Sequence, residues 1–185
     1  TMTAVQRIRV PAGMAFALIF LYFSRPRMDL FLVGLGLALA GLGIRIWAAG
    51  HIDKGSRLAA CGPYRFTRNP LYLGSFLIGL GFSLAAAKAW LVVLFLILFF
   101  ALYVPVMRRE ERELEHSFGS EYESYRRQVP FFLPRFSVGN PTEDSTPETA
   151  TRHFQWRLAF VNREHPAVVG FVLIAAVLSG QLLCV

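Results

Sequence analysis

The chain has 185 residues, of which 55% are hydrophobic and 17% charged, and its formal net charge is +7. A soluble domain of this length leaves about a third of its extended-chain surface in contact with water. The apolar runs at 30–47 and 89–106 cannot all be buried in so small a core, and an exposed surface of this kind aggregates. The composition excludes a soluble enzyme domain, a disordered chain and a disulfide scaffold. It predicts an all-α integral membrane protein.

The excess of basic residues does not indicate a nucleic-acid partner. These residues lie between apolar runs, where the positive-inside rule accounts for them, whereas a nucleic-acid reader gathers them on one soluble face. Cys61 and Cys184 are far apart in the sequence, so no disulfide framework is expected. The histidines show no paired ligand spacing, and we therefore expect no metal site.

Five apolar segments predict membrane-spanning helices, at 10–23, 30–49, 71–87, 89–106 and 167–185. The first is short for a span of about 20 residues. Lys88 alone separates the third and fourth segments, which predicts a helical hairpin. The second segment carries small residues that favour close packing of another helix: Gly34, Gly36, Ala38, Ala40, Gly41 and Gly43.

The distribution of Lys and Arg predicts the orientation. If the chain crosses at every apolar segment, most basic residues fall on one side, which holds the N-terminus, the loop at 50–70 and the long polar segment at 107–166. The positive-inside rule places that side in the cytoplasm. A Pro-containing acidic stretch at 139–152 predicts a flexible linker. It divides a core at 1–138 from a C-terminal polar segment with an extra span at 153–185.

The first polar stretch that suggests chemistry leads into the third apolar segment. Asn69 is a capping residue type, and Pro70 is suited to the first position of a helix. The free backbone N–H groups of that helix end, with Arg65 and Arg68, suit a carboxylate or phosphate. An ordinary helix start with basic interface anchors explains the same residues equally well.

The second polar stretch, at 107–119, follows the fourth apolar segment. At about 100° per residue, an apolar stripe runs along one face of this helix, and Glu110 and Glu111 lie on either side of its centre. Two acids on a packing face near the membrane boundary need a cationic partner or ligand. A solvated charged helix is the alternative.

These two stretches resemble the isoprenylcysteine carboxyl methyltransferase family and its phospholipid methyltransferase relatives. The family pattern is a Gly-x-Tyr, an Arg-His-Pro-x-Tyr-x-Gly that enters a helical hairpin, a Glu pair, a Phe-Gly-x-x-Tyr-x-x-Tyr and a Pro-containing end. The matching residues are Gly62-Pro63-Tyr64, Arg68-Asn69-Pro70-Leu71-Tyr72-Leu73-Gly74, Glu110-Glu111, Phe118-Gly119-Ser120-Glu121-Tyr122-Glu123-Ser124-Tyr125 and Pro130-Phe131-Phe132-Leu133-Pro134.

The resemblance implies about five transmembrane helices with cytoplasmic polar helices that form a pocket for S-adenosylmethionine. The residues it assigns to this cofactor are Arg57, Leu58, Ala59, Tyr64, Arg68, Asn69, Pro70, Leu71, Tyr72 and Glu110. The candidate catalytic residues are Glu111, Arg108 and Arg109. We expect Arg65, Arg68, Arg108 and Arg109 to make an electropositive pocket around the polar head of the acceptor.

The chain departs from the family pattern at three places. Asn69 replaces the usual His, and it can form hydrogen bonds but cannot titrate near neutral pH. The position before the Glu pair where the prenylcysteine enzymes place an Arg against the substrate carboxylate aligns with Val106 in this chain, with Arg108 and Arg109 close behind it. The third departure is the extra C-terminal span.

The implied function is methyl transfer to the carboxylate of an isoprenylcysteine-like or other lipophilic acceptor, small or prenylated, at the cytoplasmic face of the bilayer. Three alternatives stay open: a lipid amine N-methyltransferase with Glu111 as base, an NADPH-dependent membrane reductase of the sterol type, and a non-catalytic membrane scaffold.

Overall fold

The computed structural model describes residues 4–52, 58–135, 154–161 and 165–183, and within these ranges the chain forms helices and no strand. The expected all-α architecture is therefore confirmed for the described residues. The predicted linker at 139–152 lies outside them. The elements in chain order are α1 (Ala4–Phe23), α2 (Met28–Ala49), the 3-10 helix η1 (Gly62–Arg65), α3 (Pro70–Ala85), α4 (Ala89–Phe118), α5 (Ser120–Gln128), α6 (Trp156–Val161) and α7 (His165–Leu183).

Three helices in the described part of the chain, α2, α4 and α7, are long and apolar enough to cross a membrane. The apolar part of α1, Pro11–Phe23, and the whole of α3 are shorter. Helix is thus present at all five segments where spans are expected, and the protein is an integral membrane protein. That all five segments cross the bilayer stays a prediction.

Helix α4 is longer than the bilayer requires. The sequence predicts a span that ends at Val106, but the helix continues through Pro105 to Phe118, because the residues after Met107 are mostly good helix formers. Its 30 residues extend about 45 Å, against about 30 Å for the hydrocarbon core. The C-terminal third of α4 therefore carries Glu110 and Glu111 beyond the apolar part of the protein.

Helices α2 and α3 pack backbone against backbone. A Cβ added at Gly34 would lie 2.3 Å from the carbonyl oxygen of Gly81, and one at Gly41 would lie 2.6 Å from that of Gly74. The close approach expected from the small residues of α2 is confirmed at these two positions. Gly36 and Gly43 have no such neighbour within 4 Å, so only one face of α2 meets α3.

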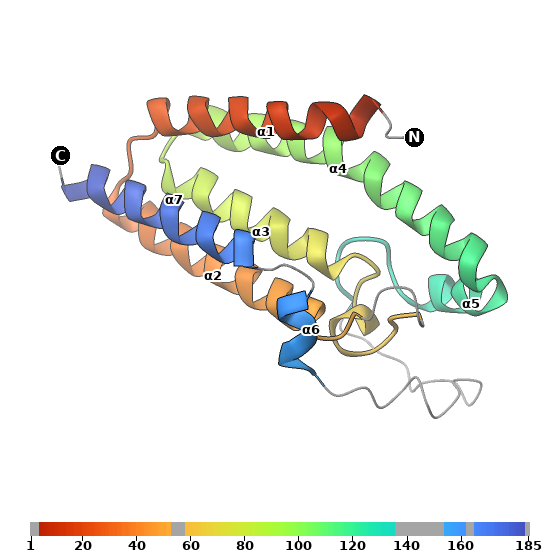
Figure 1. Cartoon of the computed structure of the whole chain (residues 1–185). Helices are drawn as coiled ribbons and strands as arrows, with labels where there is room; N and C mark the ends of the chain where they lie inside the picture. Colours follow the sequence, from red (N-terminus) through yellow and green to blue (C-terminus); the bar gives the residue numbers. More distant parts are fainter. Residues whose placement is uncertain (1–3, 53–57, 136–153, 162–164, 184–185) are drawn as a thin grey trace.

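The C-terminal helix α7 shares the core of the other helices. Phe171 packs on Phe82 of α3 with ring centroids 5.2 Å apart, and Leu178 is completely buried. At the far end of the bundle, the hydroxyl of Ser24 donates to the side-chain oxygen of Gln181 at 2.6 Å. In Figure 1, α7 lies along α2 and α3, while α1 lies along α4.

Candidate active site

A cavity of about 250 Å³ lies where the chain leaves the apolar bundle. Its walls come from the segment that leads into α3, from the extension of α4 and from α5, which Figure 1 shows at one end of the molecule. The lining residues are Ile52, Leu58, Ala59, Tyr64, Arg68, Asn69, Pro70, Leu71, Tyr72, Glu110, Glu111, Leu114, Tyr122 and Tyr125. Segments more than 40 positions apart in sequence thus line one cavity.

Arg68 and Glu111 form an ion pair in the cavity wall, with side chains only 13% and 19% exposed. Tyr122, which is buried, donates a hydrogen bond from its hydroxyl to the same carboxylate at 3.2 Å. Burial raises the pKa of the Tyr122 phenol, and the charge of Glu111 raises it further, while Arg68 opposes the shift. The phenol therefore keeps its proton and acts as a donor to Glu111.

Glu110 occupies a more open position than Glu111. Its side chain is exposed and accepts a hydrogen bond from the hydroxyl of Tyr72 at 2.8 Å. Pro70 stands at the first turn of α3, where its fixed φ suits the helix start, and this places Tyr72 opposite the extension of α4. The two carboxylates of the Glu pair therefore have different environments, one paired with Arg68 and one open to the cavity.

The sequence predicts Asn69 as a helix cap, and the structure corrects the role of its side chain. Asn69 occupies the position before α3, but its side chain makes no capping hydrogen bond. Instead the amide donates to the carbonyl oxygen of Phe131 at 2.9 Å. Thr67 donates in the same way to the carbonyl oxygen of Phe132 at 2.9 Å. Asn69 thus ties the loop after α5 to the start of α3.

The structure brings together most of the residues expected to bind a cofactor. Those in the cavity wall are Leu58, Ala59, Tyr64, Arg68, Asn69, Pro70, Leu71, Tyr72 and Glu110. Arg57 lies outside the described residues. Of the expected catalytic residues, Glu111 lines the cavity, and Arg108 and Arg109 do not.

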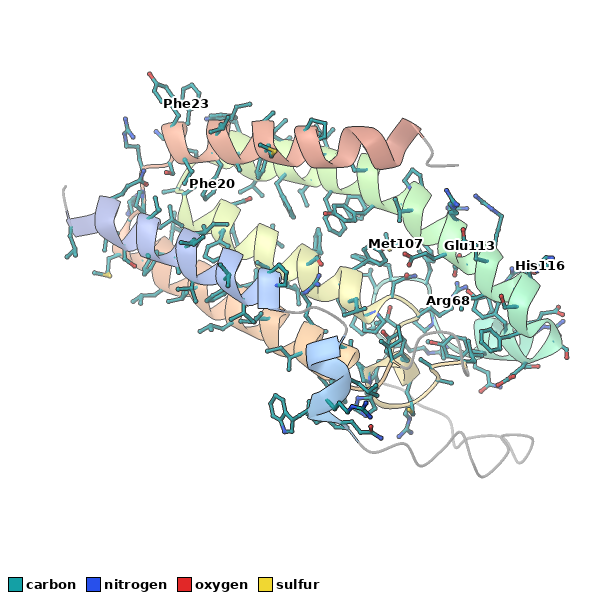
Figure 2. The ribbon with its side chains drawn as sticks, in the orientation of Figure 1. Phe20, Phe23, Arg68, Met107, Glu113 and His116 are labelled. Atoms are coloured by element: carbon teal, nitrogen blue, oxygen red, sulfur yellow. The ribbon has the colours of Figure 1, made fainter. Side chains whose placement is uncertain are left out.

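The cavity contains only part of the expected electropositive pocket. Of its four arginines, only Arg68 lines the cavity, together with two carboxylates. Arg65 is exposed on η1, and Arg109 pairs with Glu113 at 2.8 Å on the outer side of α4. Arg108 is exposed and lies over the ring of Phe131, 5.8 Å from its centroid. Figure 2 shows Arg68 on the inner side of α4 and His116 on the outer side.

Two tyrosines of α5 belong to the site and were not among the expected site residues. Tyr122 contacts Glu111, and Tyr125 donates from its hydroxyl to the carbonyl oxygen of Tyr64 at 2.8 Å. Gly119, with φ of +51°, allows the chain to turn between α4 and α5, a backbone conformation that glycine adopts without strain. The Phe-Gly-x-x-Tyr-x-x-Tyr motif carried the signal, but its spacing alone assigns no contact.

The described residues contain no group of three or more His, Cys, Asp or Glu side chains that could hold a metal ion. The fold and the cavity define a class: an integral membrane protein with a cavity at the edge of its helical bundle. The phospholipid methyltransferase family model matches residues 28–121, which include most of this site. The chain belongs to the phospholipid methyltransferase family, as the resemblance in the sequence implies.

Curated relatives extend this comparison. The chain is 38% identical over 136 residues to the cobalt-zinc-cadmium resistance protein CzcN of Cupriavidus metallidurans, an alignment that covers 66% of this chain and 61% of that protein. It is 30% identical over 82 residues to the protein-S-isoprenylcysteine O-methyltransferase of Schizosaccharomyces pombe, covering 44% of this chain and 35% of that protein. It is 36% identical over 81 residues to methanethiol S-methyltransferase 2 of Bradyrhizobium diazoefficiens, covering 44% of this chain and 30% of that protein.

The alignment with CzcN spans about three-fifths of that relative, and those with the two methyltransferases span about a third of each. No solved structure matches the chain significantly.

Proposed function

We propose that the chain is a membrane methyltransferase that binds S-adenosylmethionine in the cavity and methylates a lipophilic acceptor. One observation carries the proposal: the residues of the family motifs, Arg68 and Tyr72 on one segment and Glu110 and Glu111 on another, meet in one cavity wall. The acceptor classes considered are those in the names of the two methyltransferase relatives, an isoprenylcysteine and a small thiol.

The residues of the cavity fit this methyl donor. The Nε of Arg68 is buried and has no hydrogen-bond acceptor among the described residues, so a carboxylate of the ligand would satisfy it. Glu110 and Glu111 suit a ligand with an ammonium group and a positively charged sulfur. Leu58, Pro70 and Leu71 supply apolar surface for a planar base. The volume of about 250 Å³ lies just below the range of about 300–1,000 Å³ that is usual for small-molecule sites.

When bound, S-adenosylmethionine supplies a methyl group on a cationic sulfur. The chain's own contribution is to bind the donor and the acceptor and to orient them, because the reacting atoms need to approach within about 3–3.5 Å in line. Tyr72 holds the carboxylate of Glu110 at the cavity, and Arg68 and Tyr122 hold that of Glu111. Fixed carboxylates of this kind hold a cationic donor in one orientation, which is the positioning that the reaction requires.

Glu111 is better placed to position groups than to take a proton. Its carboxylate already accepts hydrogen bonds from Arg68 and Tyr122, and a proton on Glu111 would compete with both. A carboxylate or thiolate acceptor requires no base at the methylation step, whereas an amine acceptor does. The arrangement therefore favours transfer to a carboxylate or thiolate over methylation of a lipid amine.

The same proposal places the N-terminus and the cavity on the cytoplasmic side. The cavity lies at the start of α3 and beyond the apolar part of α4, the end of both helices that is flanked by the Arg-rich polar segments. The positive-inside rule supports this orientation.

A matched pair of variants tests the donor site. We expect Glu110→Ala to weaken binding of S-adenosylhomocysteine by at least about tenfold, since a hydrogen bond to a charged group contributes about 1.5–3 kcal/mol and about 1.4 kcal/mol is a factor of ten. Glu113→Ala removes a carboxylate from the outer side of the same helix and should bind like the wild type. Calorimetric titration in mild detergent measures both variants, and thermal denaturation confirms that each is folded. Wild-type affinity in folded Glu110→Ala would contradict the assignment.

A further inference from the structure

A cluster of aromatic rings lies between α3 and α4 and reaches the cavity wall at Tyr72. The ring cluster consists of Phe76 on α3, Phe99, Phe100 and Tyr103 on α4, and Phe132 after α5. Phe76 lies 5.1 Å from Phe99 and 5.6 Å from Phe132, and Phe99 stacks on Tyr103 at 4.7 Å, all between ring centroids. Rings at these separations are in contact, so they fill the space between α3 and α4 at this level.

The ring cluster extends from the cavity wall to the outer surface of the bundle. Tyr72, whose hydroxyl donates to Glu110 in the cavity, lies 5.7 Å from Tyr103 between ring centroids. At the other end, Phe100 is 41% exposed on the apolar part of α4, while Phe99 between them is only 3% exposed. An acceptor with a long apolar tail, its head beside Glu110 and its tail between α3 and α4, would have to displace these rings.

Phe132 is held in place by the backbone on either side of it. The carbonyl oxygen of Phe132 accepts from Thr67 at 2.9 Å, and that of Phe131 accepts from Asn69 at 2.9 Å. The backbone N–H of Arg68 donates to the carbonyl oxygen of Pro130 at 2.9 Å, and that of Arg135 donates to the carbonyl oxygen of Phe66 at 3.0 Å. Four hydrogen bonds therefore connect the segment at 130–135 to the segment that leads into α3. Moving Phe132 out of the ring cluster would break some of them.

We propose that the ring cluster limits the acceptor to a molecule with a short apolar group, such as a small alkyl thiol or a short S-alkyl cysteine acid, and excludes a chain of polyprenyl length. The inference rests on the proposed function and specifies its substrate class. The acceptor reacts as a thiolate or carboxylate, after its proton has gone to solvent. Its sulfur or oxygen lone pair forms the new bond to the methyl carbon, and the electron pair of the broken carbon–sulfur bond stays on the donor's sulfur. The rings determine which acceptor can reach that carbon.

The test uses the full chain in liposomes and pairs of acceptors with the same head group. The pairs are ethanethiol with dodecanethiol, N-acetyl-S-ethylcysteine with N-acetyl-S-farnesylcysteine, and ethylamine with dodecylamine, each with methyl-labelled S-adenosylmethionine. We expect at least one short acceptor to be methylated, and its long partner to react at least about tenfold more slowly, a ratio within reach of steric discrimination. Long acceptors methylated as fast as short ones would overturn the inference. So would the absence of methylation of every short acceptor by protein that binds S-adenosylhomocysteine.

Variants of the rings test whether the cluster is the cause. Phe132→Ala and Phe99→Ala should each raise the rate with the long acceptor by at least about tenfold. Phe99 is buried in a helix and its variant can fail to fold, whereas Phe132 lies in a loop, so Phe132→Ala keeps the test possible. Phe23→Ala removes an exposed ring at the opposite end of the bundle (Figure 2) and should leave the preference unchanged. Folded Phe132→Ala with the wild-type preference would overturn the inference. Failure of the wild type to bind S-adenosylhomocysteine would instead overturn the proposed function, and the inference with it.

Discussion

The two carboxylates of the Glu pair are adjacent in sequence and differ in what holds them. Glu111 is mostly buried between Arg68 and Tyr122, whereas Glu110 is exposed and contacts Tyr72. A mostly buried ion pair contributes little net stability, but losing one partner leaves an uncompensated charge. Glu111 thus fixes Arg68 in the cavity wall, and Glu110 lies in the more open part of that wall.

A double-mutant cycle tests the pairing of Arg68 with Glu111. We expect Arg68→Gln and Glu111→Gln each to lower the thermal midpoint, and the double variant to lose less than the sum, with a coupling energy of about 1–3 kcal/mol. The same cycle on Arg109 and Glu113, an exposed pair on α4, should show little coupling. Additive losses at Arg68 and Glu111 would contradict the ion pair.

Tyr122 and Tyr125 predict how stability depends on alkaline pH. Burial raises the pKa of both phenols above the ordinary value of 10.0. The unfolded chain loses these protons near pH 10 and the folded chain keeps them. The contribution of the two protonated phenols to the free energy of unfolding is therefore complete below pH 10. It is lost as the pH rises toward the pKa of each phenol in the folded protein, by at most about 1.4 kcal/mol per pH unit for each phenol.

The measurement is the thermal midpoint of the wild type, Tyr122→Phe and Tyr22→Phe at several values between about pH 9 and 11. The midpoint of the wild type should fall over this range, and that of Tyr122→Phe should fall less steeply. Tyr22 is exposed at the other end of the protein, so its variant should follow the wild type. Equal slopes for all three would show that Tyr122 titrates normally.

Among the helices, the pair α2 and α3 depends on glycine at a few positions. An added Cβ at Gly34 would meet the backbone of Gly81, which cannot move aside as a flexible side chain can. In lipid, helix association relies on packing of this kind. The position of α3 relative to α2, and with it the start of α3 at the cavity, follows from these close contacts.

Gly34→Ala should therefore destabilise the protein by about 1–3 kcal/mol, the usual cost of overpacking. Gly36→Ala, two residues along the same helix with no neighbour within 4 Å of its Cβ, should be neutral or slightly stabilising, because Ala favours helix over Gly. Thermal denaturation in detergent compares the two variants. A Gly36→Ala loss as large as that of Gly34→Ala would contradict the packing.

The sequence predicted best those helices that have a long apolar segment or a clear helical spacing of apolar residues. Long apolar segments located the helices, and the 100° spacing on α4 predicted that Glu110 and Glu111 lie on its packing face. It could not show that α4 is one continuous helix through Pro105, since a proline can end a helix or be accommodated in it. It also could not place Tyr122 on Glu111, because the contact depends on how α5 turns back after Gly119.

For the whole molecule, the sequence predicted the class and not the arrangement. Helix α7 is apolar on all sides, as a membrane helix is, so no pattern shows that Phe171 and Leu178 pack against α2 and α3. The electropositive pocket was expected from four arginines in the two polar stretches. Arg109 pairs with Glu113 and Arg65 is exposed because of the direction in which each side chain points, and positions in the sequence do not give that direction.

The central claim is that the cavity at the edge of this membrane bundle binds a methyl donor. Calorimetric titration of the purified wild-type chain with S-adenosylhomocysteine, with NADPH as the control ligand, tests it most directly. Our account predicts saturable binding of S-adenosylhomocysteine and none of NADPH. Binding of NADPH alone would indicate a reductase, and binding of neither ligand to folded protein would indicate a non-catalytic role; either result would contradict the account.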